Sequence, residues 1–371
     1  MKTMNLLLCL CASLLLSTAC GDKEDNNGGA TQDATVFVNP TAFEAPQEGG
    51  TYSIEASTTR EWSAFASNKE TWIKVSPANG SSGKATISIE VAANDSYTER
   101  EGQVTVKAGS DRQYVTIKQA AKEREAVDFS CPVEGYNLVW HDEFDGNALN
   151  TGDWTYEVQK DHWVNNELQN YVRETSPSGK PVVTVKDGNL SINCFKENGK
   201  VYSGRIYAKK STGWKYAYIE ASIKLPKGKG TWPAFWMMPV KFKSWPHDGE
   251  IDIMEEVGAN PNYVSSSLHA DGHVHSNNTQ WTHEMYCAGA EGEFHKYAIE
   301  WEANRIRTYV DGKLQIDYTD PGNGVRDWPY VEPFYVILNL AWGGDWGGYK
   351  GIDESALPVS MEVDYVRVWQ K

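Results

Sequence analysis

Short alternating segments fill the first third of the chain. Between residues 35 and 121, apolar side chains recur at every second position in brief runs, separated by turn residues such as Glu48-Gly49-Gly50 and Asn79-Gly80-Ser81. A period of two is typical of strands that bury one face. The runs are 35–38, 51–56, 73–75, 85–91, 102–107 and 113–119. Their spacing predicts a small immunoglobulin-like β-sandwich over residues 35–121.

The region from Cys131 to Lys371 continues this alternation over a longer stretch. Its clearest strand patterns are 218–225, 297–301, 306–310, 335–340 and 363–369. No stretch keeps the 3.6-residue period of an amphipathic helix. The region also holds 13 of the 15 Trp residues, which suit either a sandwich core or stacking on sugar rings. We therefore predict an all-β chain with a large β-sandwich at 131–371, joined to the first unit by a charged linker at 122–130.

The first residues have the layout of a secretory signal. Lys2 precedes an apolar run at 6–16, and small residues then lead directly to Cys20. This arrangement resembles a bacterial lipobox, which implies cleavage after residue 19 and lipidation of Cys20. The prediction is a signal peptide at 1–19 and a flexible polar tether at 20–34. The acidic tether is similar to that of Bacteroidetes-type lipoproteins displayed on the extracellular side of the outer membrane.

Charge and apolar content limit the partners. With 35 basic against 50 acidic residues, the net charge of -15 repels phosphate backbones, so nucleic acid is not an expected partner. No later apolar run approaches the roughly 20 residues of a transmembrane helix, so the lipid would be the only membrane attachment. The three Cys residues after Cys20 lack the spacing of a metal finger. We expect a monomer.

One stretch, Glu250-Ile251-Asp252-Ile253-Met254-Glu255-Glu256, concentrates acidic side chains. Retaining glycoside hydrolases need one carboxyl group to protonate the leaving oxygen and a second to attack the sugar. Because side chains alternate along a strand, Glu250 and Asp252 share a face while the isoleucines turn into the core. The stretch is therefore a candidate catalytic strand.

Alternation alone does not select the general acid. In a regular strand Glu256 shares the face of Asp252, whereas a one-residue bulge at Ile253-Met254 would bring Glu255 to that face. Period-two reasoning leaves both glutamates open.

The spaced motif Glu250-x-Asp252-x-x-Glu255, followed by Val257-Gly258, resembles the bulged signature of laminarinase-type members of glycoside hydrolase family 16. The resemblance implies a jelly-roll fold with Glu250 as nucleophile, Asp252 as its assistant and Glu255 as acid and base. Mutual repulsion would help to keep Glu255 protonated. Glu256 would be a neighbour that tunes the site. Further matching segments are 138–144, 166–171, 203–206, 230–237 and 363–369.

The same resemblance implies a supporting set of residues. The expected substrate-binding residues are Trp232, Trp236, Arg205, Asn166, Glu167, His269 and Trp342. Of these, Trp232 is expected to be a platform for a glucosyl ring on the non-reducing side. Trp342 begins a glycine-rich loop that either caps the acceptor side or packs as a turn. A structural Ca²⁺ is implied at Glu143, Gly188 and Asp364, and no cofactor is expected for catalysis.

The N-terminal unit resembles the BACON domain through Trp62 and the segments 72–77 and 115–119. That name implies carbohydrate binding, but we favour a spacer, because Trp62 and Trp72 suit a core equally well. The expected function is retaining endo-hydrolysis of β-1,3- or mixed-linkage β-1,3-1,4-glucan at the bacterial surface, alongside outer-membrane glycan-uptake proteins. The rivals are a non-catalytic β-glucan-binding lipoprotein and a family 16 enzyme for another polysaccharide such as agarose or porphyran.

Overall fold

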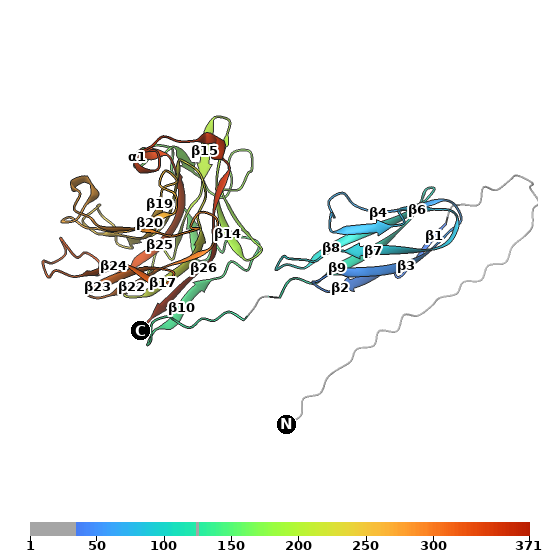
Figure 1. Cartoon of the computed structure of the whole chain (residues 1–371), viewed down its shortest axis with the longest axis horizontal. Coiled ribbons are helices and arrows are strands. Elements are labelled where there is room, and N and C mark those ends of the chain that lie inside the picture. Colours follow the sequence, from blue (N-terminus) through green and yellow to red (C-terminus); the bar gives the residue numbers. More distant parts are fainter. Residues whose placement is uncertain (1–34, 124–125) are drawn as a thin grey trace, which may run out of the picture. The chain divides into compact units, whose positions relative to one another are not determined.

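The computed structural model describes residues 35–123 and 126–371, which form two compact β-rich units (Figure 1). The predicted signal peptide, the lipidation site Cys20 and the tether at 20–34 lie outside the described residues. No helix in the part of the chain that the structure describes is long and apolar enough to cross a membrane.

The first unit is a sandwich of two antiparallel sheets, with strand orders β1-β3-β7-β5 and β2-β9-β8-β4-β6. Every predicted run overlaps a strand, although the run 35–38 begins one residue before β1. The predicted turn residues Asn79-Gly80 instead form a short strand paired with Trp62-Ser63. The strands are β1 Val36–Asn39, β2 Ala42–Ala45, β3 Gly50–Thr58, β4 Trp62–Ala66, β5 Ile73–Ser76, β6 Asn79–Gly80, β7 Gly83–Val91, β8 Arg100–Ala108 and β9 Asp111–Gln119.

The second unit packs a ten-stranded sheet against a seven-stranded sheet. The ten-stranded sheet runs β12-β15-β14-β26-β17-β22-β23-β24, with β10 beside β26 and β13 beside β14, and the seven-stranded sheet runs β11-β16-β25-β18-β19-β20-β21. The elements are β10 Asn137–Asp142, β11 Trp154–Tyr156, β12 Gln169–Tyr171, β13 Val183–Lys186, β14 Asn189–Glu197, β15 Lys200–Ser203, β16 Arg205–Ala208, β17 Tyr218–Lys224, β18 Thr231–Pro239, β19 Glu250–Glu256, β20 Tyr263–His269, η1 His275–Asn277, β21 Trp281–Tyr286, β22 His295–Glu302, β23 Arg305–Val310, β24 Lys313–Thr319, β25 Phe334–Trp342, α1 Gly344–Gly347, η2 Glu354–Ala356 and β26 Val359–Gln370.

Three tight hairpins of the ten-stranded sheet follow directly from the sequence. Asp187-Gly188, Asn198-Gly199 and Asp311-Gly312 each join two antiparallel strands, and both residues of each pair have positive φ. Such backbone angles match the right-handed twist of the flanking strands and favour Asp-Gly and Asn-Gly pairs. The register of these hairpins is therefore set locally.

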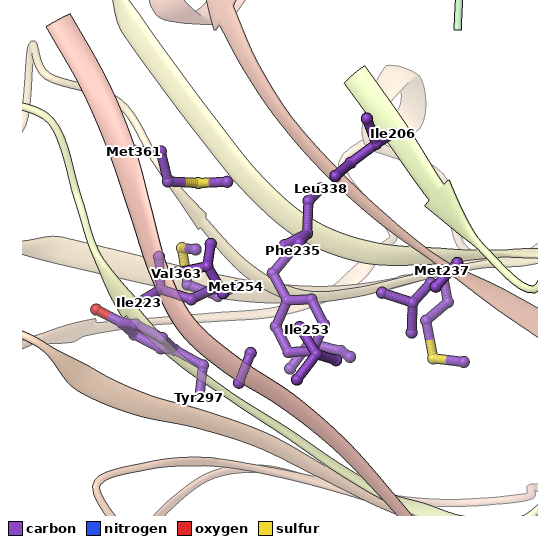
Figure 2. Close-up of a cluster of buried hydrophobic side chains, with 14 of the residues drawn as sticks. Ile206, Ile223, Phe235, Met237, Ile253, Met254, Tyr297, Leu338, Met361 and Val363 are labelled. Atoms are coloured by element: carbon purple, nitrogen blue, oxygen red, sulfur yellow. The ribbon is translucent and has the colours of Figure 1, made fainter. Parts of the chain in front are cut away.

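The core of the second unit lies between its two sheets. Figure 2 shows Phe235 of β18 and Ile253 and Met254 of β19 packed with Ile223 of β17 and Val363 of β26, which belong to the other sheet. All five side chains are buried. This apolar layer fixes which side chains of the seven-stranded sheet turn outward. We call the outward face, which carries Glu250, Asp252 and Glu255, the active face.

Candidate active site

Strand β19 carries the catalytic carboxylates because it is bulged. Phe235 pairs with Met254 and Trp236 with Asp252, so Ile253 is the extra residue, and both Ile253 and Met254 point into the core. On the other side the register of β19 with β20 also shifts between Asp252 and Glu255. The bulge moves Glu255 to the face of Asp252. The predicted bulge at Ile253-Met254 is therefore confirmed.

The residue immediately before β19 must be glycine. Gly249 has a φ of 86°, and a Cβ there would lie 2.8 Å from Cγ of Pro329. The left-handed backbone and the close approach together require glycine. Gly249 thus sets the direction in which the chain enters β19 immediately before Glu250.

Three polar side chains meet at the beginning of β19. His269 of β20 pairs with Glu250, and its Nε2 lies 3.0 Å from Oδ2 of Asp252 and 3.9 Å from Oε1 of Glu250. The side chain of Asp252 is 4% exposed, whereas that of Glu250 is 19% exposed. Asp252 is thus a buried partner of His269, and Glu250 is the carboxylate that a sugar can reach. The resemblance implies a histidine close to the acid, whereas the ion-pair contacts of His269 are with Asp252 and Glu250.

Burial and mutual repulsion shift the protonation of both glutamates. Burial, followed by the charge of Asp252, raises the pKa of Glu250 to about 8 and that of Glu255 to about 8. His269 lowers the pKa of both groups. Glu255 raises and Arg205 lowers the pKa of Glu250, whereas Glu167 raises and Trp232 lowers that of Glu255. Both carboxyl groups thus have raised pKa values of about 8, so the pKa alone does not separate the nucleophile from the acid.

Trp232 lies beside the acid. Its indole Nε1 donates a hydrogen bond to Oε1 of Glu255 at 3.0 Å, and its ring meets that of Trp346 edge to face at 5.4 Å. The indole thereby lowers the pKa of Glu255 and fixes the orientation of its carboxyl group. Trp232 was predicted as a sugar platform, and the structure gives it a second task, which is to orient the acid.

Glu256 points the other way. It is fully buried, and its Oε1 accepts a hydrogen bond from the backbone N–H of Asn262 at 3.1 Å. Burial and the neighbouring Glu291 raise the pKa of Glu256 to about 9. No catalytic residue is among the causes of that shift, and Glu256 is not among the causes that shift Glu255. The bulge turns the Glu256 side chain into the interior, away from the face of Glu255, and a tuning role for Glu256 stays a prediction.

A stacked arginine occupies the active face on the other side of β18. Arg205 begins β16 and is 8% exposed, with its guanidinium 4.7 Å from the ring of Trp236 and 5.2 Å from the ring of Trp163. Trp236 donates its indole N–H to Oδ1 of Asn339 at 2.7 Å, which holds the ring in place. Within the part of the chain that the structure describes, the buried Nε of Arg205 has no hydrogen-bond partner. Its N–H groups are thus available to sugar hydroxyls rather than to an ion pair.

A polar network supports this part of the active face. Glu167 is buried and accepts hydrogen bonds from Gln169 at 2.7 Å, from Asn165 at 3.2 Å and from the Tyr171 hydroxyl at 3.4 Å. Burial raises the pKa of Glu167. These hydrogen bonds tie Glu167 to its protein neighbours, and its contact with sugar stays a prediction. Asn166 is exposed and donates to Oδ1 of Asp345 at 2.8 Å, so it joins two surface loops.

Trp342 is not a substrate-binding residue. Its side chain is fully buried in the core between the two sheets, and its backbone N–H donates to Oε1 of Gln169 at 2.7 Å. Trp342 is the last residue of β25 and pairs with Thr231 of β18, and at this register its indole points into the core. The indole that reaches the active face from this loop is that of Trp346, which was not singled out from the sequence. Of the two predicted roles for the loop, the packed turn is the one that Trp342 adopts.

Comparison with known proteins agrees with this arrangement. Residues 170–367 match the model of glycosyl hydrolases family 16, and residues 61–120 match that of the BACON domain, described as a putative N-terminal binding domain. The chain belongs to glycosyl hydrolase family 16. The family assignment covers the second unit, where all the catalytic candidates lie.

One named protein and two solved structures illustrate what this family 16 chain is similar to. A protein of Rhodothermus marinus named β-glucanase is 40% identical over 248 residues, which are 63% of this chain and 85% of that protein. The laminarinase structure from Rhodothermus marinus is 38% identical, with a TM-score of 0.59 over 63% of this chain and 97% of that one. A mutant of a non-specific endo-β-1,3(4)-glucanase, co-crystallised with 1,3-β-D-cellotriosyl-glucose, is 38% identical, with a TM-score of 0.61 over 64% of this chain and 96% of that one.

The family 16 unit also places aromatic groups at the site that the sequence did not reveal. The rings of Trp245 and His275 lie 5.9 Å and 5.8 Å from that of His269, and 5.4 Å from each other. Both residues are exposed. They come from the loops before β19 and after β20, whose conformations have no periodic pattern. A Trp-Pro or His-Ser pair in such a loop gives no signal that it will meet the catalytic strand.

The predicted Ca²⁺ site fits this chain poorly at its first ligand. Both carboxylate oxygens of Glu143 accept hydrogen bonds from Arg367 at 2.8 Å, so a guanidinium already occupies the position of a cation. Gly188 lies in the β13–β14 hairpin, and Asp364 lies in β26 beside Val363. A cation bound through the Glu143 carboxylate would have to displace Arg367. Catalysis by the carboxylates described above involves no step at this position.

The tryptophans of the BACON-like unit serve its core. Trp62 is buried among Val104, Val106 and Ala108, and the half-buried Trp72 packs against the same cluster. A Cβ at Gly80 would lie 2.6 Å from the indole of Trp62, which shows how closely β6 covers that ring. Neither indole is presented as a sugar platform.

Proposed function

We propose that this chain is a retaining endo-β-1,3(4)-glucanase. The observation that carries the proposal is the bulge of β19, which brings Glu255 to the same face as Glu250 and Asp252. The relatives described above are named β-glucanase, laminarinase and endo-β-1,3(4)-glucanase, and each similarity covers 63% or 64% of this chain. The proposed substrates are β-1,3-glucan and mixed-linkage β-1,3-1,4-glucan.

In the first step, the ionised Glu250 attacks the anomeric carbon and the bond from that carbon to the leaving oxygen breaks. Glu255 gives its proton to the leaving oxygen, which departs as the hydroxyl of the released chain, and a glycosyl ester on Glu250 remains. In the second step, water attacks the same carbon, Glu255 takes the water's proton and Glu250 leaves as a carboxylate. Two inversions retain the anomeric configuration.

Each neighbour has a task in this sequence. Asp252 pairs with His269 beside Glu250, and His269 lowers the pKa of Glu250 and so favours its ionised form. Trp232 orients the acid through its indole N–H. Arg205, held over Trp236, offers donors to hydroxyls of the sugar on the β16 side of β19. These groups are positioned before substrate binds, which favours transition-state stabilisation.

Product analysis tests the proposal. We expect the chain to release oligosaccharides from laminarin, lichenan and barley glucan but not from agarose, and NMR of the fresh products should show the β-anomer first. Inversion of configuration would contradict the mechanism. Binding of laminarin without release of any reducing sugar would favour the rival non-catalytic function.

We further propose that the chain is a lipoprotein on the outer membrane and that it faces outward alongside glycan-uptake proteins. The support is the sequence alone, namely the apolar run at 6–16 that ends at Cys20 and the polar tether at 20–34. Radiolabelled palmitate should be incorporated into the parent but not into Cys20→Ser. Protease treatment of intact cells should digest the parent, and protection of the protein would contradict its outward orientation.

A further inference from the structure

The active face extends beyond β19 onto two more strands. Ser265 of β20 pairs with Glu255, and Glu284 of β21 pairs with Ser265. The pairing of β20 with β21 is regular from Tyr263 to Leu268. Side chains on one face of this pair can therefore be identified by counting in steps of two from Ser265.

Counting in this way places two tyrosines on the active face. Tyr263 is two residues from Ser265, and the intervening Val264 is buried in the core. Tyr286 pairs directly with Tyr263, and the two ring centroids are 5.2 Å apart with an interplanar angle of 57°. Tyr263 is 41% exposed and Tyr286 is 59% exposed. An exposed aromatic pair thus continues the surface that contains the catalytic carboxylates.

The surroundings of the pair suit a carbohydrate. Glu284 lies on the same face as Tyr286 and accepts a hydrogen bond from Asn260 at 3.1 Å, so polar groups that can bind hydroxyls flank the rings. Aromatic rings with polar neighbours are the combination that binds the apolar face and the hydroxyls of a sugar. Tyr263 lies about 7 Å along β20 from Ser265, and neighbouring strands of the sheet are about 5 Å apart. The pair is therefore within reach of a short oligosaccharide bound at Glu255.

Sheet order decides which part of the substrate the pair would meet. Arg205 and Trp236 lie on β16 and β18, on one side of β19, whereas β20 and β21 lie on the other side. If the sugars on the non-reducing side of the cleaved bond occupy the Arg205 side, the leaving chain must pass over β20 and β21. We propose that Tyr263 and Tyr286 form a platform for glucosyl residues of the leaving chain, an inference that rests on the proposed glucanase function.

The test compares two substrates in the full chain. Laminarin extends over both sides of β19, whereas a nitrophenyl β-laminaribioside places only the aryl group on the leaving side. In the Tyr263→Ala/Tyr286→Ala double variant we expect kcat/KM for laminarin to fall roughly tenfold, the effect of losing two stacking rings, while aryl glycoside hydrolysis stays within about twofold. The Tyr263→Phe/Tyr286→Phe variant, which keeps both rings, should retain most of the laminarin activity.

Two controls separate the possible causes. Tyr114→Ala removes a tyrosine of the first unit with 46% exposure and should leave both activities unchanged. If the double alanine variant does not fold, Tyr286→Thr carries the same comparison, because Thr is a good strand former. A double variant whose ratio of laminarin to aryl activity equals that of the parent would overturn the platform. Failure of the parent on both substrates would instead refute the glucanase function.

Discussion

The two faces of strand β19 carry adjacent glutamates with different surroundings. Glu255 accepts a hydrogen bond from an indole N–H and is subject to the charges of Asp252 and His269. Glu256 accepts a hydrogen bond from a backbone N–H, and a second glutamate raises its pKa. Burial raises the pKa of both groups well above the ordinary value of 4.5. A raised pKa alone therefore does not identify a catalytic acid. The face on which the carboxyl group lies, and its distance from a nucleophile, identify it.

The nucleophile gives the largest expected effect on the active face. Replacing Glu250 by Gln removes the attacking oxygen but keeps the shape of the side chain. We expect kcat on laminarin to fall by at least the roughly 10²–10⁴-fold that a general acid contributes, because no glycosyl ester can form. Reducing-sugar release measures the loss, and laminarin binding should persist. Activity within tenfold of the parent would show that another residue attacks the sugar.

A change at His269 tests the active face of β19 separately from the opposite face, because His269 lies beside Glu250 and Asp252. His269→Ala removes a group 3.0 Å from Asp252 that lowers the pKa of Glu250. We expect kcat/KM to fall by roughly ten- to a hundredfold, the scale of a lost hydrogen bond to a charged group. The pKa of Glu250 should also rise, so the acidic limb of the pH profile should move to higher pH. An unchanged acidic limb would mean that His269 has only a structural role.

The alkaline limb should report on Glu255. Its pKa of about 8 means that the acid loses its proton as the pH rises through that value, so kcat/KM should fall above pH 8. Trp232→Phe removes the indole donor that lowers this pKa. The alkaline limb of that variant should therefore lie at a higher pH than in the parent. A shift in the opposite direction would contradict the role given to Trp232.

The smallest effect is expected from a change at Glu256, and it should appear in thermal stability rather than in activity. Its pKa is about 9 in the folded chain against an ordinary 4.5, so the folded state holds the proton more tightly. The associated stability is complete below pH 4.5 and is lost as the pH rises through 9. Glu256→Gln should raise Tm at pH 8 by roughly 2–4 °C, the shift for about 1 kcal/mol in a unit of this size. Calorimetry at pH 5 and pH 8 would show whether the gain is confined to the higher pH.

Much of the fold could be predicted because alternation is a local signal. The predicted runs 218–225 and 335–340 overlap β17 and β25, and the inward-facing Ile251 and Ile253 also follow from the period of two. The bulge could not be derived in that way, since it depends on how Phe235 and Trp236 pair with β19. The bulge was predicted from the resemblance to family 16 and not from the period of two.

The parts of the site that were wrong or missed depend on long-range packing. Trp342 was predicted to bind substrate because it adjoins a glycine-rich loop, but its strand register buries it. Trp346, two residues beyond that loop's first glycines, reaches Trp232 instead. The sequence also offered no sign that Glu143, an expected Ca²⁺ ligand, would accept hydrogen bonds from Arg367, far along the chain. Trp245 and His275 converge on His269 from separate loops.

The most direct test of the central claim compares Glu255→Gln with Glu256→Gln in one assay on laminarin. Both changes replace one carboxyl group by an isosteric amide on the same strand, at the half-buried Glu255 or at the buried Glu256. We expect Glu255→Gln to lower kcat by roughly 10²–10⁴-fold, because the leaving oxygen receives no proton, and Glu256→Gln to stay within about twofold of the parent. A large loss in Glu256→Gln with little loss in Glu255→Gln would mean that the bulge does not place the acid as described.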